Sequence, residues 1–226
     1  MIKLNKLISH VMICSTLLFV GCSSTETLKA PEISSDGLTL KHISQSTIVY
    51  KKSGIDFSNY DKVKILPGTV AFKKNWQRDY NRSASTLSTQ IKDKDVVRIK
   101  GSVASLLNEV FIEEFSRNDD YPIVDIASEG TLLIKPSIID LDINAPDITS
   151  SRITRTITEE SGSATLFLEI YDAVSGEILA RIVDTETAEN NSHYQWSTRV
   201  SNHADAKRII KKWAKALRSN FDQAHE

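Results

Sequence analysis

Three side chains that could bind a metal ion stand close together in the sequence. Asp140, Asp142 and Asn144 alternate along the chain, and carboxylate and amide oxygens in this pattern begin many calcium-binding loops. The pattern then fails, because Ala145 stands where the loop needs glycine and Ser151 where it needs a bidentate glutamate. The alternation is more typical of the solvent face of a strand. We therefore expect no calcium site.

Two histidines, His193 and His203, lie where a site could form. Their spacing does not match the histidine pair of a helical zinc motif, and no cysteine is available to complete a ligand set. We expect no bound metal and no cofactor.

The sequence contains no recognisable catalytic motif. No serine lies in Gly-x-Ser-x-Gly, and the 8 glycines form no phosphate-binding loop. The acidic pairs at 119–120 and 159–160 stand in polar, turn-like segments, where carboxylates are usually solvated. Catalytic carboxylates must converge in three dimensions, which a sequence does not reveal. We assign no catalytic residue, and enzymatic activity stays open.

The one cysteine for which the sequence indicates a role is Cys22. It follows two lysines, an apolar run over residues 7–20 and the small residue Gly21. This order is typical of an export signal, and the run is shorter than the roughly 20 residues that a membrane-spanning helix needs. We predict a signal peptide over residues 1–21. Its removal also removes Cys14, which leaves no pair for a disulfide.

Residues 19–22, Phe-Val-Gly-Cys, resemble the lipobox of bacterial lipoproteins, with Phe19 in place of the preferred leucine. The resemblance implies a lipid on Cys22 that attaches the protein to a membrane. Ser23 stands where an aspartate would retain a lipoprotein in the inner membrane. The resemblance therefore implies an outer-membrane location, with the domain facing the periplasm.

The charge balance excludes one class of partner. The net charge is −1, and loss of the two signal-peptide lysines makes the mature chain more acidic. Nucleic-acid binders usually show a clear basic excess, so we expect no nucleic-acid partner.

Composition divides the rest of the chain into two parts. Residues 22–53 are rich in Ser, Thr and Lys and predict a lipidated tether. Residues 54–226 predict a single domain, long enough to bury a core. A flexible tether of this length would hold the domain about 30 Å from the lipid on average.

Hydrophobic patterns predict the following strands in this domain: 63–66 and 69–72 around Pro67-Gly68, 122–126, 131–143, and a hairpin of 164–171 and 178–187 with its turn at Ser175-Gly176. Pro136 inside segment 131–143 favours an edge strand or a bulge. Residues 73–90 read as a long polar loop, which by its length is functional or flexible.

Helical spacing predicts two amphipathic helices, at 95–116 with Asp93 or Asp95 as N-cap and at 203–221 with Asn202 as N-cap. The fold class predicted is α+β, with a mixed or mostly antiparallel sheet and both helices packed on one face.

Basic residues line the polar side of the second helix: Lys207, Arg208, Lys211, Lys212, Lys215 and Arg218. They could form a patch for an anionic envelope component or an ordinary solvated face. We favour the solvated face.

Four aromatic residues are the candidate contact residues: Trp76, Tyr80, Tyr194 and Trp196. Tryptophan and tyrosine anchor interfaces because they combine a large apolar area with a polar group. The alternative is that the two tryptophans close the edge of the core, with their N–H groups on loop carbonyls.

Several motifs resemble an uncharacterised family of bacterial outer-membrane lipoproteins, domain of unknown function 3313. They are Tyr-Asp-Lys-Val at 60–63, Val-Ala-Phe-Lys-Lys-Asn-Trp at 70–76, Leu-Asp-Ile-Asn-Ala-Pro-Asp at 141–147, Tyr-Asp-Ala-Val-Ser-Gly-Glu at 171–177, and Gln-Trp at 195–196. The resemblance spans about residues 45–222 and implies no catalytic residues. The order of elements is also similar to that of the curli-secretion lipoprotein and of penicillin-binding-protein activators, which is an analogy of fold.

Three functions follow as hypotheses. The first is a non-enzymatic interaction module that binds an envelope protein or assembly. The second is a binder or enzyme for a small molecule, lipid or glycan, which a deep apolar pocket would favour. The third is a self-assembling envelope component.

Overall fold

The computed structural model describes most of the chain from residue 30 onward. The described residues are 30–84, 86–117, 120–144, 146, 156–158, 160–189, 195–197 and 199–226. The signal peptide, Cys22 and Tyr194 lie outside the described residues, so their roles stay predictions.

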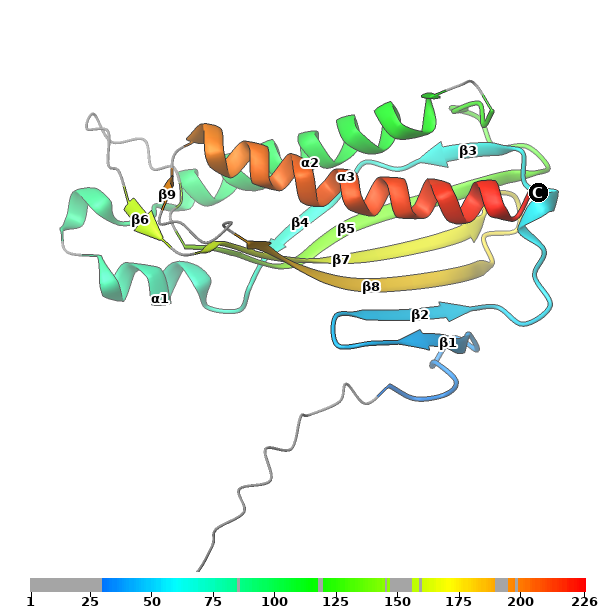
Figure 1. The fold of residues 1–226 in the computed structure, drawn as a ribbon, viewed down its shortest axis with the longest axis horizontal. Coiled ribbons are helices and arrows are strands. Elements are labelled where there is room, and N and C mark those ends of the chain that lie inside the picture. The colour runs from blue at the N-terminus through cyan, green and yellow to red at the C-terminus, as the bar shows by residue number, and fades with distance from the viewer. Residues whose placement is uncertain are drawn as a thin grey trace, which may run out of the picture.

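A mixed sheet of seven strands forms the centre of the domain (Figure 1). Its order is β1-β2-β8-β7-β5-β3, and β4 pairs with β5 beyond the end of β3. The strands are β1 (Thr39–Ile43), β2 (Thr47–Lys51), β3 (Lys62–Ile65), β4 (Thr69–Phe72), β5 (Thr131–Ile143), β7 (Glu160–Asp172) and β8 (Ile178–Glu189). All pairs are antiparallel except those of β3 and β4 with β5. A separate small sheet pairs β6 (Thr156–Thr158) with β9 (Gln195–Ser197).

Two long helices lie side by side on one face of this sheet (Figure 1). The helices are α1 (Trp76–Ser83), α2 (Asp93–Phe115) and α3 (Arg199–Gln223), with short 3-10 turns at Phe57–Asn59 and Leu87–Thr89. α2 and α3 run in the same direction, and the main core fills the space between them and the sheet. This arrangement confirms the predicted α+β class.

The hairpin of β7 and β8 shows why the pattern predicted it. Ala164, Leu166, Leu168 and Ile170 alternate along β7, and all four are buried on the face toward the helices. Gly176 in the turn has a φ of 71°, a conformation that favours glycine.

The predicted tether does not reach residue 53. β1 and β2 form a hairpin at the edge of the sheet, and β2 pairs with β8. Before them, Asp36 forms an ion pair with Arg181 of β8, and the Tyr50 hydroxyl donates to the Pro31 carbonyl at 2.8 Å. The folded domain therefore includes the segment from about residue 31. β1 and β2 have five residues each, too few for an alternation of apolar and polar residues that would distinguish a strand from a polar loop.

The predicted polar loop at 73–90 contains the helix α1. Its side chains hold it to the start of α2: the Asn81 amide donates to the Ile91 carbonyl at 3.0 Å and accepts from the Ile91 N–H at 2.7 Å. Trp76, the first residue of α1, is buried in a small apolar cluster with Ile91 and Ile99. Tertiary contacts therefore stabilise a helix that is too short and too polar for a recognisable period.

Pro136 lies in an interior strand, although the sequence favoured an edge or a bulge. The Leu66 N–H donates to the Ile134 carbonyl at 2.9 Å, so residue 136, two positions further, directs its backbone toward the same side. β3 ends at Ile65 and β4 begins at Thr69. The break between these strands falls where proline offers no N–H.

Both predicted N-caps were wrong. α2 begins after Lys92, whose backbone N–H donates to the Asp95 carboxylate at 3.1 Å, so neither Asp93 nor Asp95 is the cap residue. α3 begins at Arg199, which puts Asn202 inside the helix. Packing of the apolar stripes extends both helices beyond the caps that residue type suggested.

The predicted strand at 122–126 is a single parallel bridge between Ile123 and Val63. Val63 donates to the Pro122 carbonyl at 3.0 Å, and Val124 donates to the Val63 carbonyl at 2.9 Å. The segment meets only β3, at the margin of the sheet, so its pairing stops after one bridge.

Candidate functional site

A cavity of about 580 Å³ lies between α2, α3 and the sheet. Its lining residues are Arg98, Ile99, Ser102, Val103, Leu106, Ile138, Leu141, Asp142, Ile143, Pro146, Gly162, Ser163, Ala164, Ala188, His203, Asp205, Ala206, Ile209, Ile210 and Trp213. They come from residues 98–106 of α2, from residues 203–213 of α3 and from the end of the sheet where β5 and β8 end and β7 begins. Such a volume is typical of small-molecule sites, which span roughly 300–1,000 Å³.

The cavity exists because small side chains face one another across it. Ala164 of β7, Ala188 of β8 and Ala206 of α3 all line it, whereas the next inward positions along β7 are the larger Leu166 and Leu168. Close packing normally fills the space between helix and sheet. Three alanines from three elements leave that space open here.

Side-chain contacts join the two helices both beside the cavity and beyond it. The Lys207 ammonium of α3 lies 3.3 Å from the Glu109 carboxylate of α2. Nearer the C-terminal ends, the Arg218 guanidinium donates to the Glu114 carbonyl at 3.2 Å and to the Arg117 carbonyl at 3.1 Å. The Arg218 contacts thus join the C-terminal ends of the helices, and the Lys207–Glu109 pair bridges them beside the cavity.

Trp213 forms one end wall of the cavity and is 4% exposed. Its indole N–H donates to the Asp184 carboxylate of β8 at 2.7 Å. The Thr47 hydroxyl donates to the same carboxylate at 2.5 Å. With its N–H already bonded, the indole presents a carbon surface to the cavity.

The polar lining residues lie at the opening rather than in the interior. Ser102 and His203 are exposed, and Asp142 is partly exposed. The Asp142 carboxylate forms an ion pair with Lys73 at 2.7 Å, and this hydrogen bond raises the pKa of the Lys73 ammonium. The Asp205 carboxylate lies 3.7 Å from Arg208. The opening is therefore polar and the interior apolar.

Trp76 and Tyr80 lie together beside the cavity. The Trp76 ring stacks on Phe72 at 3.9 Å between centroids and lies 6.1 Å from the Tyr80 ring. Trp76 is 6% exposed, and its N–H donates to the Ile143 carbonyl at 3.1 Å. This is the core-closing arrangement that the sequence left as an alternative. Burial raises the pKa of the Tyr80 hydroxyl.

A smaller hollow of about 280 Å³ lies at this pair. Trp76 and Tyr80 line it with Lys73, Asp79 and Asp142. Of the two remaining contact candidates, Trp196 lies on β9 and Tyr194 outside the described residues. Their contact role stays a prediction.

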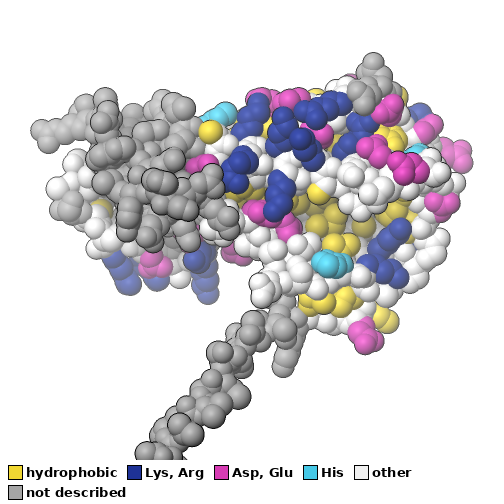
Figure 2. Space-filling model, in the orientation of Figure 1, with side chains coloured by type: hydrophobic (Ala, Val, Ile, Leu, Met, Phe, Trp, Pro, Cys, Tyr) yellow, Lys and Arg dark blue, Asp and Glu magenta, His cyan; other side chains and the backbone are white. Residues whose placement is uncertain are grey.

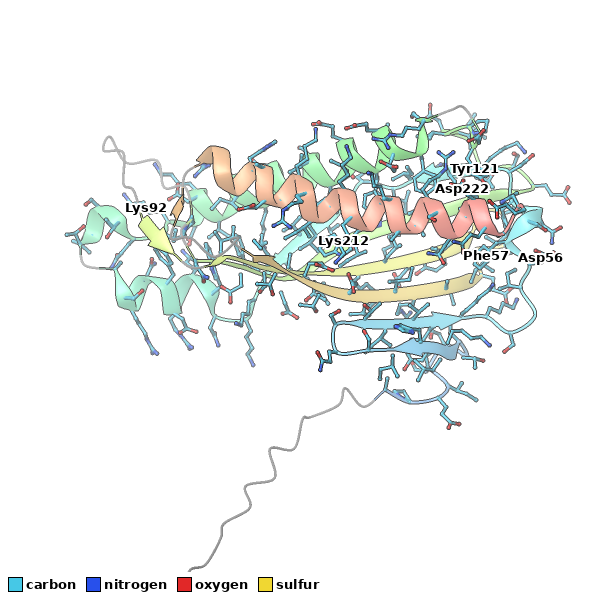
Figure 3. The ribbon with its side chains drawn as sticks, viewed as in Figure 1. Asp56, Phe57, Lys92, Tyr121, Lys212 and Asp222 are labelled. Atoms are coloured by element: carbon cyan, nitrogen blue, oxygen red, sulfur yellow. The ribbon has the colours of Figure 1, made fainter. Side chains whose placement is uncertain are left out.

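The basic face of α3 is interspersed with acidic side chains (Figure 2). Lys212 projects from α3 toward the sheet (Figure 3), where its ammonium lies 2.5 Å from the Glu186 carboxylate. Lys207 and Arg208 also have acidic partners. Arg218 is buried, with a side chain 8% exposed, so it does not belong to any surface patch. These pairings favour the solvated face over an anion-binding patch.

Among the residues that the structure describes, no group of three or more His, Cys, Asp or Glu side chains could hold a metal ion. None of the described helices is both long enough and apolar enough to cross a bilayer.

A family model described as "Protein of unknown function (DUF3313)" matches residues 33–217. The chain belongs to this family. The match covers the whole sheet and the cavity-lining parts of both long helices, so the resemblance noted in the sequence motifs is confirmed. No curated protein matches the chain significantly.

Solved structures similar to this DUF3313 domain are remote. The PelC dodecamer from Paraburkholderia phytofirmans is 12% identical, with a TM-score of 0.33, 74% of this chain covered and 94% of that one. A DUF330 protein from Xanthomonas campestris is 9% identical, with a TM-score of 0.41 and coverages of 70% and 81%. A candidate lipoprotein from Caulobacter crescentus is 10% identical, with a TM-score of 0.33 and coverages of 74% and 89%. Likeness at this level carries no conclusion about function.

Proposed function

We propose that the chain is an outer-membrane lipoprotein, anchored through Cys22, whose DUF3313 domain is a non-enzymatic accessory module that binds a ligand in the cavity. The observation that supports this most is the cavity itself, about 580 Å³ in volume and walled by buried aliphatic side chains. A well-formed apolar pocket with polar groups at its opening is the usual form of a binding site. The second hypothesis from the sequence, a binder, thus gains support over recognition by an aromatic surface.

Binding rather than catalysis fits the carboxylates at the opening. Asp142 is paired with Lys73 at 2.7 Å and Asp205 with Arg208 at 3.7 Å. A general acid or base needs a pKa matched to its task and access to the reacting group. Both carboxylates already contact a basic side chain, an arrangement that suits positioning the walls of the cavity.

The short connection between anchor and domain supports a role close to the membrane. Ala30 lies eight positions after Cys22, a length of chain that at full extension spans at most about 30 Å. From Pro31 onward the chain is bonded to the sheet. An anchored domain would thus work within reach of the lipid surface.

Site-specific crosslinking in intact cells tests the binding role. A photo-reactive diazirine amino acid is placed in the full-length protein at Val103, which lines the cavity, or at Ala216, which is exposed on α3. Illumination is expected to give a discrete adduct from position 103 that position 216 does not give. Equal, non-specific labelling from both positions would contradict a binding role for the cavity.

The anchor has a separate test. Cys22→Ala is expected to abolish lipid labelling and to release the protein from membranes. Ser23→Asp keeps the lipid and is expected to move the protein from the outer to the inner membrane on a density gradient. Unchanged membrane attachment of Cys22→Ala would refute the assignment of the anchor.

An envelope-protein partner remains a second candidate, which the 280 Å³ hollow beside Tyr80 favours. Tyr80 is partly exposed there, and tyrosine is a common anchor of interfaces. The diazirine amino acid at Tyr80 is expected to capture a protein if this candidate is right. Failure to capture any protein from that position would remove it.

A further inference from the structure

We infer that the occupant of the cavity is a single hydrocarbon chain of a membrane lipid, with the polar head of the lipid left at the opening. The inference rests on the proposed function and names its ligand. It follows from the chemistry of the walls, the volume of the cavity and the supply of ligand.

The walls separate by burial into an apolar interior and a polar opening. The buried lining residues include Ile138, Leu141, Ile209 and Ile210, which are aliphatic. The one polar group of Trp213, its N–H, is bonded to Asp184. A sugar or a nucleotide would lose its hydrogen bonds to water in such an interior and gain few in return, which is unfavourable. A hydrocarbon chain loses nothing by the same transfer.

The volume suits one chain. A methylene group occupies about the volume of a water molecule, roughly 30 Å³, so about 580 Å³ has room for on the order of 15 to 20 such groups. One acyl chain of a membrane lipid fits within this space, whereas two chains side by side exceed it.

The opening suits the other end of an amphiphile. Ser102 and His203 are exposed there, and Arg98 has a side chain 38% exposed. These groups can meet a head group without being desolvated, because water still reaches them. A polar opening above an apolar interior matches a molecule that is itself polar at one end and apolar along its length.

Supply of the ligand follows from the anchor. The chain is bonded to the sheet from Pro31 onward, so with the anchor at Cys22 this edge of the domain stays within about 30 Å of a lipid surface. Membrane lipids are then the most concentrated amphiphiles within its reach.

The crosslinked adduct at position 103 identifies the ligand by mass spectrometry of the full-length protein. The expected increment is the mass of one phospholipid or other acyl lipid of the host membrane. A protein or glycan adduct would overturn the lipid inference and leave the binding role of the cavity standing. A link to the acylated N-terminal peptide of the chain itself would likewise overturn it, because the occupant would then be the anchor. Absence of any adduct specific to position 103 would remove the proposed function as well.

A matched pair of variants ties the lipid to the cavity. Ala206→Phe extends a side chain from α3 into the space, whereas Ala216→Phe adds the same group on the exposed side of the same helix. The yield of lipid adduct is expected to fall about tenfold or more in Ala206→Phe, because the ring displaces several methylene contacts. It is expected to stay at the wild-type level in Ala216→Phe. Ala206→Ile, with a smaller group, should give an intermediate loss if Ala206→Phe folds poorly, and an equal yield in all three variants would overturn the inference.

Discussion

Gly68 lies close against α2 at the edge of the sheet. Its backbone N–H donates to the Asn108 side chain at 2.7 Å. A Cβ atom added at this position would lie 2.6 Å from Cδ2 of Leu107, a residue that is fully buried. The absence of a side chain at position 68 therefore gives Leu107 of α2 the room to pack against the Pro67-Gly68 break.

Two glycine substitutions are expected to have opposite effects on stability. Gly68→Ala should lower the free energy of unfolding by about 1–3 kcal/mol, because the core has no room for the added methyl group. Gly101 lies inside α2, and a Cβ atom added there would meet no neighbouring side chain or other element within 4 Å. Gly101→Ala should therefore raise the free energy of unfolding by about 0.5–1 kcal/mol. Urea-induced unfolding of both variants measures the difference. Equal stability of Gly68→Ala and the wild type would contradict the close contact.

At the scale of elements, Arg218 joins the ends of α2 and α3. Besides the Glu114 and Arg117 carbonyls already described, its guanidinium donates to the Phe115 carbonyl at 3.3 Å and to the Asp120 carboxylate at 2.5 Å. It also lies over the Tyr121 ring, 4.7 Å from the centroid. Tyr121 and Asp222 lie together at the C-terminal end of α3 (Figure 3), and burial together with the hydrogen bond to Asp222 raises the pKa of Tyr121 to about 12.

Removal of this side chain should separate the helix ends. Arg218→Ala is expected to lower the free energy of unfolding by about 2–4 kcal/mol, because it leaves carbonyl and carboxylate oxygens without their donor. Arg208→Ala is the matched control on the same helix; its side chain is 57% exposed, and its loss should cost at most about 1 kcal/mol. Thermal unfolding of the two variants compares them. Similar losses would show that Arg218 is an ordinary surface residue.

The elements that could be predicted from the sequence are those long enough for their hydrophobic pattern to repeat several times. The alternation from Ala164 to Ile170 and the helical stripes of α2 and α3 reflect burial against the core, and these elements formed as expected. β1, β2 and α1 were missed because each is short and is stabilised by partners distant in sequence, such as Arg181 for Asp36 and Ile91 for Asn81.

The candidate site was largely beyond prediction for the same physical reason. The spacing of Ile209, Ile210 and Trp213 predicted an apolar helix face, and these residues do line the cavity. The empty space, however, arises where Ala164, Ala188 and Ala206 face one another. Alanine is common in both strands and helices, so no local pattern marks these three as neighbours.

On the scale of the whole molecule, the two faces of the sheet are covered differently. The helices and the cavity occupy one face. On the other face, Arg181 joins Asp36 of the N-terminal segment to Glu169 of β7, with a distance of 3.0 Å to Glu169. The Lys135 ammonium lies 3.0 Å from the same carboxylate. This network attaches the segment nearest the predicted anchor to the centre of the sheet.

The network predicts a loss of stability in acid. The Arg181 guanidinium lowers the pKa of Asp36 below 3.8; burial alone would raise the pKa of Glu169, but Lys135 and Arg181 outweigh it and lower that pKa below 4.5. Both pKa values are lower in the folded state than in the unfolded chain. As the pH falls from the unfolded pKa values toward the folded ones, the unfolded chain therefore binds more protons than the folded one. The stabilisation is thus complete at neutral pH and declines below about pH 4.5.

Urea unfolding between pH 7 and pH 3 measures this dependence. Arg181→Gln should be less stable at neutral pH and should lose less stability on acidification than the wild type. Arg78→Gln, which removes an exposed ion pair with Asp79, should follow the wild-type pH profile. An unchanged acid dependence in Arg181→Gln would contradict the role of the network.

The central claim is that the space between α2 and α3 is an occupied binding site. Native mass spectrometry of the full-length protein, purified from its own membranes in mild detergent, tests it most directly. The wild type is expected to carry one non-covalent lipid per chain, which Ala216→Phe retains and Ala206→Phe loses. A wild-type protein without bound lipid, or a lipid carried equally by Ala206→Phe, would contradict the account.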